Sequence, residues 1–125
     1  MTPAQSLNQH RSMLAAIGED IEVRRYAGSG ALRAVAKRAI VRGRVLGMGS
    51  KELVGETVQG TRKIIVVNDP DAAVGPGNVA LAELLPLTTG DKLFFRNTEV
   101  AILGIDDDTR RIAGVLIALE IMARG

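Results

Sequence analysis

The hydrophobic residues at the start of the chain recur at helical spacing. The positions that share one helical face are Leu7, Leu14 and Ile17, with Met13 beside them. Thr2 and Pro3 suit a helix start, because threonine can cap the first backbone N–H groups and proline at the first position loses no needed hydrogen bond. The pattern predicts one amphipathic helix over residues 3–17, with Gly18 as a left-handed C-cap.

Beyond the helix, the hydrophobic period becomes that of a strand. In the segment IEVRRYA, residues 21–27, apolar and charged residues alternate. A glycine-containing segment at 27–35 predicts a loop, and residues 36–46 alternate again. One face of this second strand carries Ala39, Val41, Gly43 and Val45, and the other carries Arg38, Ile40, Arg42 and Arg44. We therefore expect two strands, the second with a basic outer face.

The second half of the chain is predicted to consist of short strands and one irregular linker. RKIIVVND, residues 62–69, is a β-branched run that ends in a turn signal. Residues 72–87 lack a clear period, apart from one helical turn near VALAEL. From residue 90 onward the pattern predicts a strand, a tight turn at Asn97 and Thr98, a second strand, an acidic turn and a last strand.

The last of these segments, residues 112–123, fits two kinds of structure. Val115, Ile117, Leu119 and Ile121 alternate as in a strand, whereas Ile112, Leu116, Leu119 and Met122 also fit a helix. We favour the strand. Several short strands at this spacing indicate a mainly β protein: a small β-barrel or sandwich with one N-terminal helix and long flexible loops near 27–35, 47–56 and 69–90.

Composition limits both the number of domains and the chemistry. A chain of 125 residues with 46% apolar residues can bury one core but not two, so we expect a single domain over residues 1–125. Aromatic residues make up only 2% of the chain, which leaves few carriers for base stacking. There is no cysteine, hence no disulfide framework and no thiolate, as is usual for an intracellular protein. We expect no membrane span and no secretory signal.

The net charge of +2 hides an asymmetry between the two halves. Residues 1–63 hold 11 Lys and Arg against 5 Asp and Glu, whereas residues 64–125 hold 5 against 9. Eight basic residues with no acidic residue among them make up one block: Arg24, Arg25, Arg33, Lys37, Arg38, Arg42, Arg44 and Lys51. Such a block attracts phosphates or the carboxylates of a partner, so these eight are our candidate interface or DNA-facing residues. A solvated strand face with a mobile loop is the alternative.

No pattern in the chain selects an enzyme. The stretch GMGSKELVGETVQG at 47–60 is glycine-rich, but Lys51 follows Ser50 and precedes Glu52, which is the wrong order for a Walker loop. The three carboxylates at 106–108 lack the spacing of a calcium loop. The chain has one histidine, His10, and no other residue type selects a nucleophile and base. We therefore expect no catalytic site, no cofactor and no metal site.

The order of these features resembles that of the head-closure or head-tail connector proteins found in the neck of tailed bacteriophages. The resemblance rests on ELVGETVQGTRKIIV, residues 52–66, and on GDKLFFRNTEVAILGID, residues 90–106, which with the helix cover most of the chain. Its motifs are patterns of glycine, charge and apolar alternation, and the linker at 72–87 is longer and more apolar than the family pattern.

The resemblance implies a compact β-barrel that forms a ring, commonly of six subunits, beneath the portal and its adaptor. Such a ring seals the packaged genome and presents the docking surface for the tail. The implied partners are other copies of the chain, the portal or adaptor ring and the tail proteins, with nonspecific contact to packaged DNA as a further candidate. The implied location is the neck of the virion, after assembly in the host bacterial cytoplasm.

Two other functions stay open at this point. A nucleic-acid-binding barrel of the oligonucleotide-binding type would use the basic strand at 36–46, although the scarcity of aromatic residues weighs against it. Another phage ring component, such as a tail terminator or a minor tail protein, would have a similar small fold.

Overall fold

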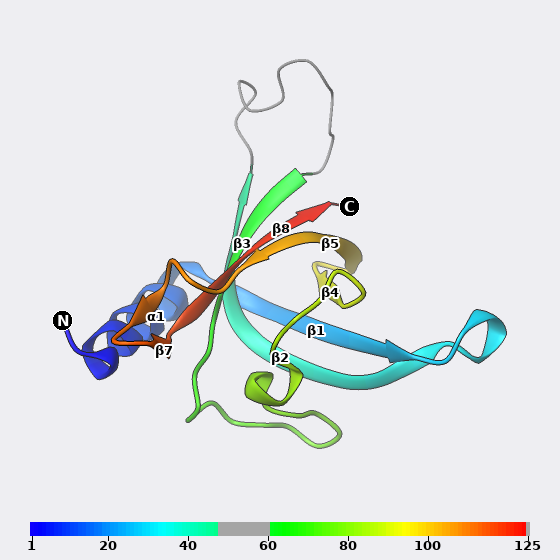
Figure 1. Cartoon of the computed structure of the whole chain (residues 1–125), viewed down its shortest axis with the longest axis horizontal. Helices are drawn as coiled ribbons and strands as arrows, with labels where there is room; N and C mark the ends of the chain where they lie inside the picture. Colours follow the sequence, from blue (N-terminus) through cyan, green and yellow to red (C-terminus); the bar gives the residue numbers. More distant parts are fainter. Residues whose placement is uncertain (48–60, 125) are drawn as a thin grey trace, which may run out of the picture.

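The computed structural model describes residues 1–47 and 61–124, and this part of the chain is mainly β with one α-helix (Figure 1). The elements in chain order are α1 (Pro3–Ile17), β1 (Glu19–Ala27), the 3-10 turn η1 (Gly30–Leu32), β2 (Ala34–Gly47), β3 (Thr61–Val67), the 3-10 turn η3 (Leu81–Leu84), β4 (Lys92–Phe95), β5 (Thr98–Asp106), β6 (Arg111–Ile112), β7 (Val115–Leu116) and β8 (Ala118–Arg124). The mainly β class, the N-terminal helix over 3–17 and the helical turn in the linker are confirmed. The predicted loop at 47–56 lies almost wholly outside the described residues.

Six strands close into a barrel in the order β1-β2-β3-β8-β5-β4. Every neighbouring pair in the barrel is antiparallel. The short strands β6 and β7 form a separate hairpin beside it. Of the two predicted architectures, the barrel is therefore the one that forms.

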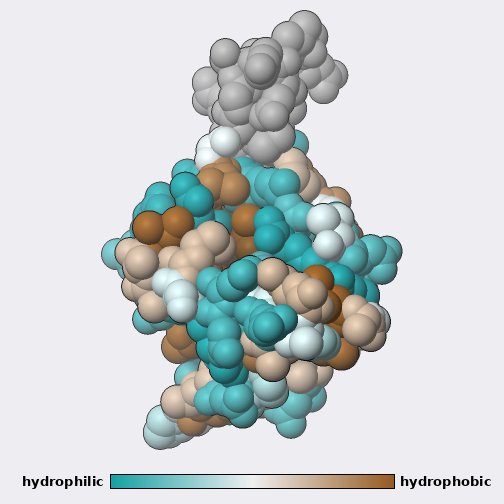
Figure 2. All heavy atoms as spheres, turned by 90° about the vertical axis from the view of Figure 1, so that its left-hand side faces the viewer, coloured by the Kyte–Doolittle hydropathy of each residue, from teal (hydrophilic) through white to brown (hydrophobic). Residues whose placement is uncertain are grey.

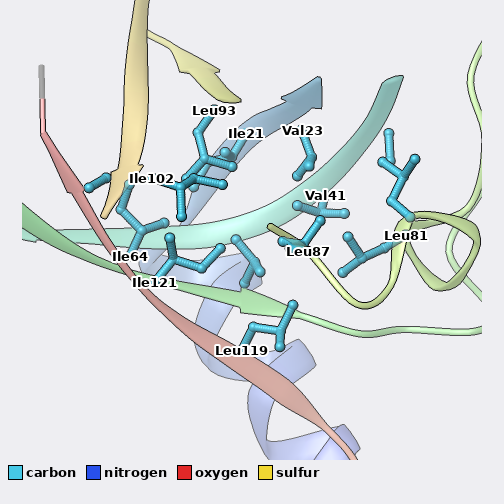
Figure 3. Close-up of a cluster of buried hydrophobic side chains, with 14 of the residues drawn as sticks. Ile21, Val23, Val41, Ile64, Leu81, Leu87, Leu93, Ile102, Leu119 and Ile121 are labelled. Carbon is cyan, nitrogen blue, oxygen red and sulfur yellow. The ribbon is translucent and has the colours of Figure 1, made fainter. Parts of the chain in front are cut away.

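The inside of the barrel is filled by aliphatic side chains from alternate strand positions (Figure 3). Ile21 and Val23 of β1 are fully buried, as are Ile64 and Val66 of β3. On β2, Ala39 and Val41 point inward while Arg38 and Ile40 are exposed, as the alternation predicts. Each Å² of apolar surface that is removed from water contributes about 25 cal/mol of favourable free energy. This core is therefore the main source of stability.

Gly43 allows β2 to pass close to its neighbours in the barrel. A Cβ atom at this position would lie 2.7 Å from the backbone oxygen of Ile65 and 2.6 Å from the Cδ1 atom of Ile21. Both separations are below any ordinary contact distance, so a larger residue would force strands β2 and β3 apart.

Helix α1 begins as the sequence predicts but ends differently. Thr2 and Gln5 form a reciprocal capping box, in which each side chain bonds the other residue's backbone N–H group. The prediction of a left-handed C-cap is wrong, because Gly18 has φ −92° and ψ −178°. Glycine is required here for space: a Cβ atom would lie 2.5 Å from the oxygen of Leu14 and 2.7 Å from that of Gly43.

The buried side of α1 also differs from the predicted one. The helix packs on the outside of the barrel against β2, β3 and β6, and its buried residues are Ser6 and Leu14. Ile17, expected on the apolar face, is 54% exposed. The inward stripe thus runs along positions 6, 10 and 14, and two of its three residues are polar. Figure 2 shows the mixed surface that results on this side of the molecule, with hydrophobic and hydrophilic side chains interspersed.

The turn between β4 and β5 lies at a position other than the predicted one. The β4–β5 hairpin turns at Arg96 and Asn97, with φ values of 50° and 62°, while Thr98 pairs with Phe95 in the ladder. The prediction of Asn97 and Thr98 is therefore one residue too late. Two successive residues with positive φ are what a two-residue hairpin needs to match strand twist.

The strand assignment over 112–123 is confirmed, but it is not one strand. Ala113 and Gly114 both have positive φ and form a tight turn between β6 and β7. The continuous strand begins at Ala118.

No helix among residues 1–47 and 61–124 is long and apolar enough to cross a membrane.

Candidate functional site

The candidate site is a two-stranded ribbon formed by the ends of β1 and β2, residues 25–38, which we call the arm. Strand β1 pairs with β4 only as far as Arg24, and β2 pairs with β3 only from Gly43 onward among the described residues. Beyond these points the two strands continue together, and Figure 1 shows them leaving the barrel as a long hairpin. The linker holds the base of this ribbon, since the Val79 N–H group donates to the carbonyl of Arg38 at 2.8 Å. Beyond the base no third strand of the described residues lies beside the ribbon, and a two-stranded ribbon is marginally stable alone in water.

Local sequence explains the shape of the arm. The register of β1 against β2 shifts between Arg25 and Tyr26, which leaves Ala36 as an extra residue on β2. A bulge of this kind increases the twist of the ribbon. At the tip, Gly28 has φ +83°, and a Cβ there would lie 2.5 Å from the oxygen of Leu32. The tip therefore requires glycine at this position.

Arg25, the first of the arm's basic residues, is used inside the protein. Its guanidinium donates to both carboxylate oxygens of Asp91 at 2.9 Å, to the carbonyl of Leu84 at 2.7 Å and to that of Pro86 at 3.3 Å. Burial alone would raise the pKa of Asp91, but the hydrogen bonds from Arg25 and Thr88 hold it below its ordinary value. This clamp fixes the loop before β4 to the base of the arm.

Arg42 closes the C-terminal end of α1. It donates to the carbonyl oxygens of Leu14 at 3.0 Å and Gly18 at 2.9 Å, and it lies 3.3 Å from a carboxylate oxygen of Asp20. A cation at this end of a helix also interacts favourably with the helix dipole. Arg42 therefore joins the helix to the barrel, which the sequence pattern did not indicate.

Arg24 and Arg38 share the carboxylate of Glu22. Arg24 bonds this carboxylate directly, donates to Glu99 at 3.0 Å and lies over the ring of Phe94 at 3.9 Å from its centroid. Arg38 is 44% exposed, and its Nη1 atom lies 3.7 Å from a Glu22 oxygen. The basic block is thus partly neutralised by an acidic residue that precedes it in the sequence.

The arm keeps three exposed basic side chains. Arg33, Lys37 and Arg38 are all exposed, and in residues 1–47 and 61–124 no carboxylate lies within ion-pair distance of the first two. Arg33 stacks on the ring of Tyr26 at 4.4 Å, and the hydroxyl of Tyr26 donates to Glu99. Arg44 is half-buried on β2 outside the arm. Lys51 lies outside the described residues.

The structure also shows features of the arm that sequence reasoning missed. Leu32 at the tip is 85% exposed, the largest exposed fraction of any large hydrophobic residue in the described part of the chain. The signal for it was present, since a leucine within a glycine-containing loop has no strand face to occupy. The tip therefore combines an apolar side chain with the adjacent basic side chain of Arg33.

Each of the three aromatic side chains has at least one face covered within the protein. Phe95 is 2% exposed in the core. Arg24 covers one face of Phe94, and Arg33 covers one face of Tyr26. A single-strand binding barrel relies on accessible aromatic faces, so this arrangement disfavours that function.

A second polar cluster lies under α1, away from the arm. Glu120 is 8% exposed and pairs with Lys63 at 2.5 Å, while the Nε atom of Arg110 lies 3.7 Å away and is buried without a hydrogen-bond partner among the described residues. Arg110 donates through Nη1 to His10 Nε2 at 3.1 Å, and His10 Nδ1 in turn donates to the carbonyl of Ser6 at 2.9 Å. This chain of contacts ties the helix to β8.

The described residues contain no group of three or more His, Cys, Asp and Glu side chains positioned to hold a metal ion. Comparison of the chain with protein families, with curated proteins and with solved structures gave no match.

Proposed function

We propose that this chain is a structural protein of the neck of tailed bacteriophages, a head-closure or head-tail connector subunit. In this role it forms a ring between the portal or its adaptor and the tail, seals the packaged DNA and docks the tail. The single observation that carries the proposal is the arm, a ribbon that leaves the barrel with an apolar tip and exposed basic side chains. A ribbon of this kind gains stability when a partner covers it.

The distribution of the basic residues favours a protein partner for the arm. Arg25 and Arg42 are held by internal hydrogen bonds and are unavailable to a partner. The arm exposes three basic side chains, of which only Arg33 adjoins Leu32, whereas DNA binding depends on several phosphate contacts and gains nothing from an exposed leucine. A protein surface that offers carboxylates around an apolar depression fits the arm better.

The test is a charge reversal on the arm that leaves the internal clamps intact. Arg33→Glu with Lys37→Glu changes the charge of the arm by four units. Arg62→Glu with Arg124→Glu changes the charge by the same amount on β3 and β8 and serves as the matched control. Both variants are produced in the bacterium that makes the particles, and the yield of tailed particles is counted by electron microscopy.

We expect the arm variant to reduce tail joining while the control leaves it near the native level. The native protein should bind duplex DNA weakly at two salt concentrations. Two results together would overturn the proposal: normal tail joining by the arm variant, and tight binding of duplex DNA by the native protein with a steep dependence on salt. For DNA binding, the logarithm of the binding constant falls with the logarithm of the salt concentration with a slope of about −0.9 per neutralised phosphate. The nucleic-acid function would then take its place.

A further inference from the structure

An apolar pocket opens at the end of the barrel near β7, and nothing proposed so far uses it. Its volume is about 450 Å³. The apolar side chains that line it are Leu85, Leu87, Ile105, Leu116 and Leu119, and we call it the β7 pocket. Leu87 and Leu119 belong to the core, so the pocket is an entrance to the hydrophobic interior. A volume of this size is ample for one aliphatic side chain.

The polar edge of the β7 pocket carries one acidic and one basic side chain, and a second acidic residue lies beside it. Asp107 and Arg111 both line it, with 3.8 Å between their charged groups. Arg111 also lies 3.9 Å from Asp108, whose side chain is 92% exposed. One arginine therefore faces two carboxylates.

The arm tip has the complementary character. Leu32 is 85% exposed, and Arg33 beside it is exposed and basic. Lys37 is also exposed, but it pairs with Arg25 nearer the base of the arm. The stacking of Arg33 on Tyr26, together with the Tyr26–Glu99 hydrogen bond, fixes the strands behind the tip. A side chain presented from a fixed backbone loses less conformational freedom on binding than one from a mobile loop.

We infer that copies of this chain associate head to tail, with Leu32 of one copy seated in the β7 pocket of the next. In this contact the basic residues of the arm face Asp107 and Asp108 of the neighbour. The inference rests on the proposed ring and names the surfaces that build it. A contact between two different surfaces of one chain propagates and closes into a ring when the rotation between copies divides a full turn.

Two other arrangements of the same surfaces are disfavoured. A copy does not fill its own pocket, because Figure 1 shows the arm tip on the far side of the barrel from β7. A symmetric contact between two arms would bring basic residues together, since no acidic residue lies between Arg24 and Lys51.

The absence of cysteine from the chain makes the contact directly measurable. Two single-cysteine variants, Leu32→Cys and Leu116→Cys, are mixed at millimolar concentration under mild oxidation. A disulfide between them forms only if their Cα atoms come within about 7 Å of each other. The control mixture pairs Leu32→Cys with Leu103→Cys, because Leu103 is also apolar and 48% exposed but lies on β5 outside the pocket. The products are resolved on a non-reducing gel.

We expect the Leu32→Cys and Leu116→Cys mixture to give a mixed dimer and the control mixture to give only background. Addition of Arg33→Glu to the first variant should lower the yield about tenfold, as like charges then meet across the contact. Addition of Asp108→Lys to the second variant should restore it. Circular dichroism of each variant before mixing verifies that the barrel is folded.

Equal yields in the two mixtures, or a dimer of Leu32→Cys with itself as the main product, would overturn the head-to-tail contact. The same cross-link is sought in purified particles. Particles that contain the chain but lack the cross-link reject the contact and keep the proposed function. A strong cross-link of the pure protein, with the chain missing from particles, keeps the contact and rejects the function.

Discussion

The clamp between Arg25 and Asp91 gives the sharpest prediction for stability. The perturbation is Arg25→Met, which keeps the length of the side chain but removes its charge and its donors. The Asp91 side chain is only 3% exposed, whereas that of Arg25 is 31% exposed. The substitution therefore leaves a buried carboxylate that has lost its cationic partner and keeps only the hydrogen bonds from Thr88.

The expected loss is about 3 kcal/mol in the free energy of unfolding at neutral pH. Breaking a buried ion pair from one side costs about 3–5 kcal/mol, and the partial exposure of Arg25 moves the value to the lower end. For a domain of this size the midpoint of thermal unfolding should fall by roughly 10 °C. The control is Arg38→Met, which removes a contact of 3.7 Å at an exposed position and should cost less than about 0.5 kcal/mol.

The dependence on pH separates this mechanism from a loss of packing. In the native protein the pKa of Asp91 lies below its ordinary 3.8, so the clamp contributes stability above that pH and loses it as the pH falls through the folded-state value. In Arg25→Met, burial without the arginine raises the pKa of Asp91, and protonation relieves the strain of the buried charge. Urea denaturation from pH 7 down to pH 4 should therefore show that the difference in the free energy of unfolding between the native protein and Arg25→Met becomes smaller. A difference that stays constant over this range would refute the reasoning.

Three further predictions test other parts of the account. Gly43→Ala should lower the free energy of unfolding by about 2 kcal/mol in the same urea assay, because its Cβ would lie 2.7 Å from a backbone oxygen of β3. The control is Gly104→Ala, whose Cβ would have no described atom within 4 Å and which should leave the free energy of unfolding nearly unchanged. Arg42→Met should speed amide hydrogen exchange in the last turn of α1 and cost about 1 kcal/mol, since the helix carbonyls lose their donor; unchanged exchange would exclude a capping role. The carboxyl of Asp106 should titrate with a pKa of about 2 in an NMR experiment, and Thr109→Val should raise that value toward 3.8, because the Thr109 hydroxyl bond is its main cause.

The barrel strands could be predicted from the sequence because a strand with one buried face has a strict period of two. Ile21 and Val23 alternate with charged residues, Ala39 and Val41 alternate with Arg38, Ile40 and Arg42 on the outer face, and all four inward residues are buried in the barrel. The helix start could be predicted for a similar local reason, since its cap is formed by residues within one turn.

The buried side of α1 could not be predicted from hydrophobicity. Its inward stripe includes Ser6 and His10. His10 contacts Arg110, which lies 3.7 Å from Glu120, and both of these partners come from the other end of the chain. A polar residue that is buried against a distant polar partner has no signal in the local pattern.

For the same reason, the sequence pattern could not show which residues of the basic block have partners inside the protein. Arg25 donates to Asp91, which lies 66 residues later in the chain, and Arg42 donates to the carbonyl groups at the end of α1. Counting charges along the sequence groups both residues with the exposed arginines, because such a count contains no information on partners that become neighbours only when the barrel closes. The residues left for an interface, Arg33 and Lys37 foremost, emerge only after the internal partners are known.

The central claim, that this chain forms the neck ring of a tailed phage, is tested most directly by electron cryomicroscopy of native tailed particles from the bacterium that carries the gene. The account predicts a closed ring of this six-stranded barrel between the portal or adaptor and the tail, with the arm of each copy against its neighbour. Density for the barrel in the capsid shell or at the tail tip, or particles whose mass spectrum lacks the chain, would contradict it.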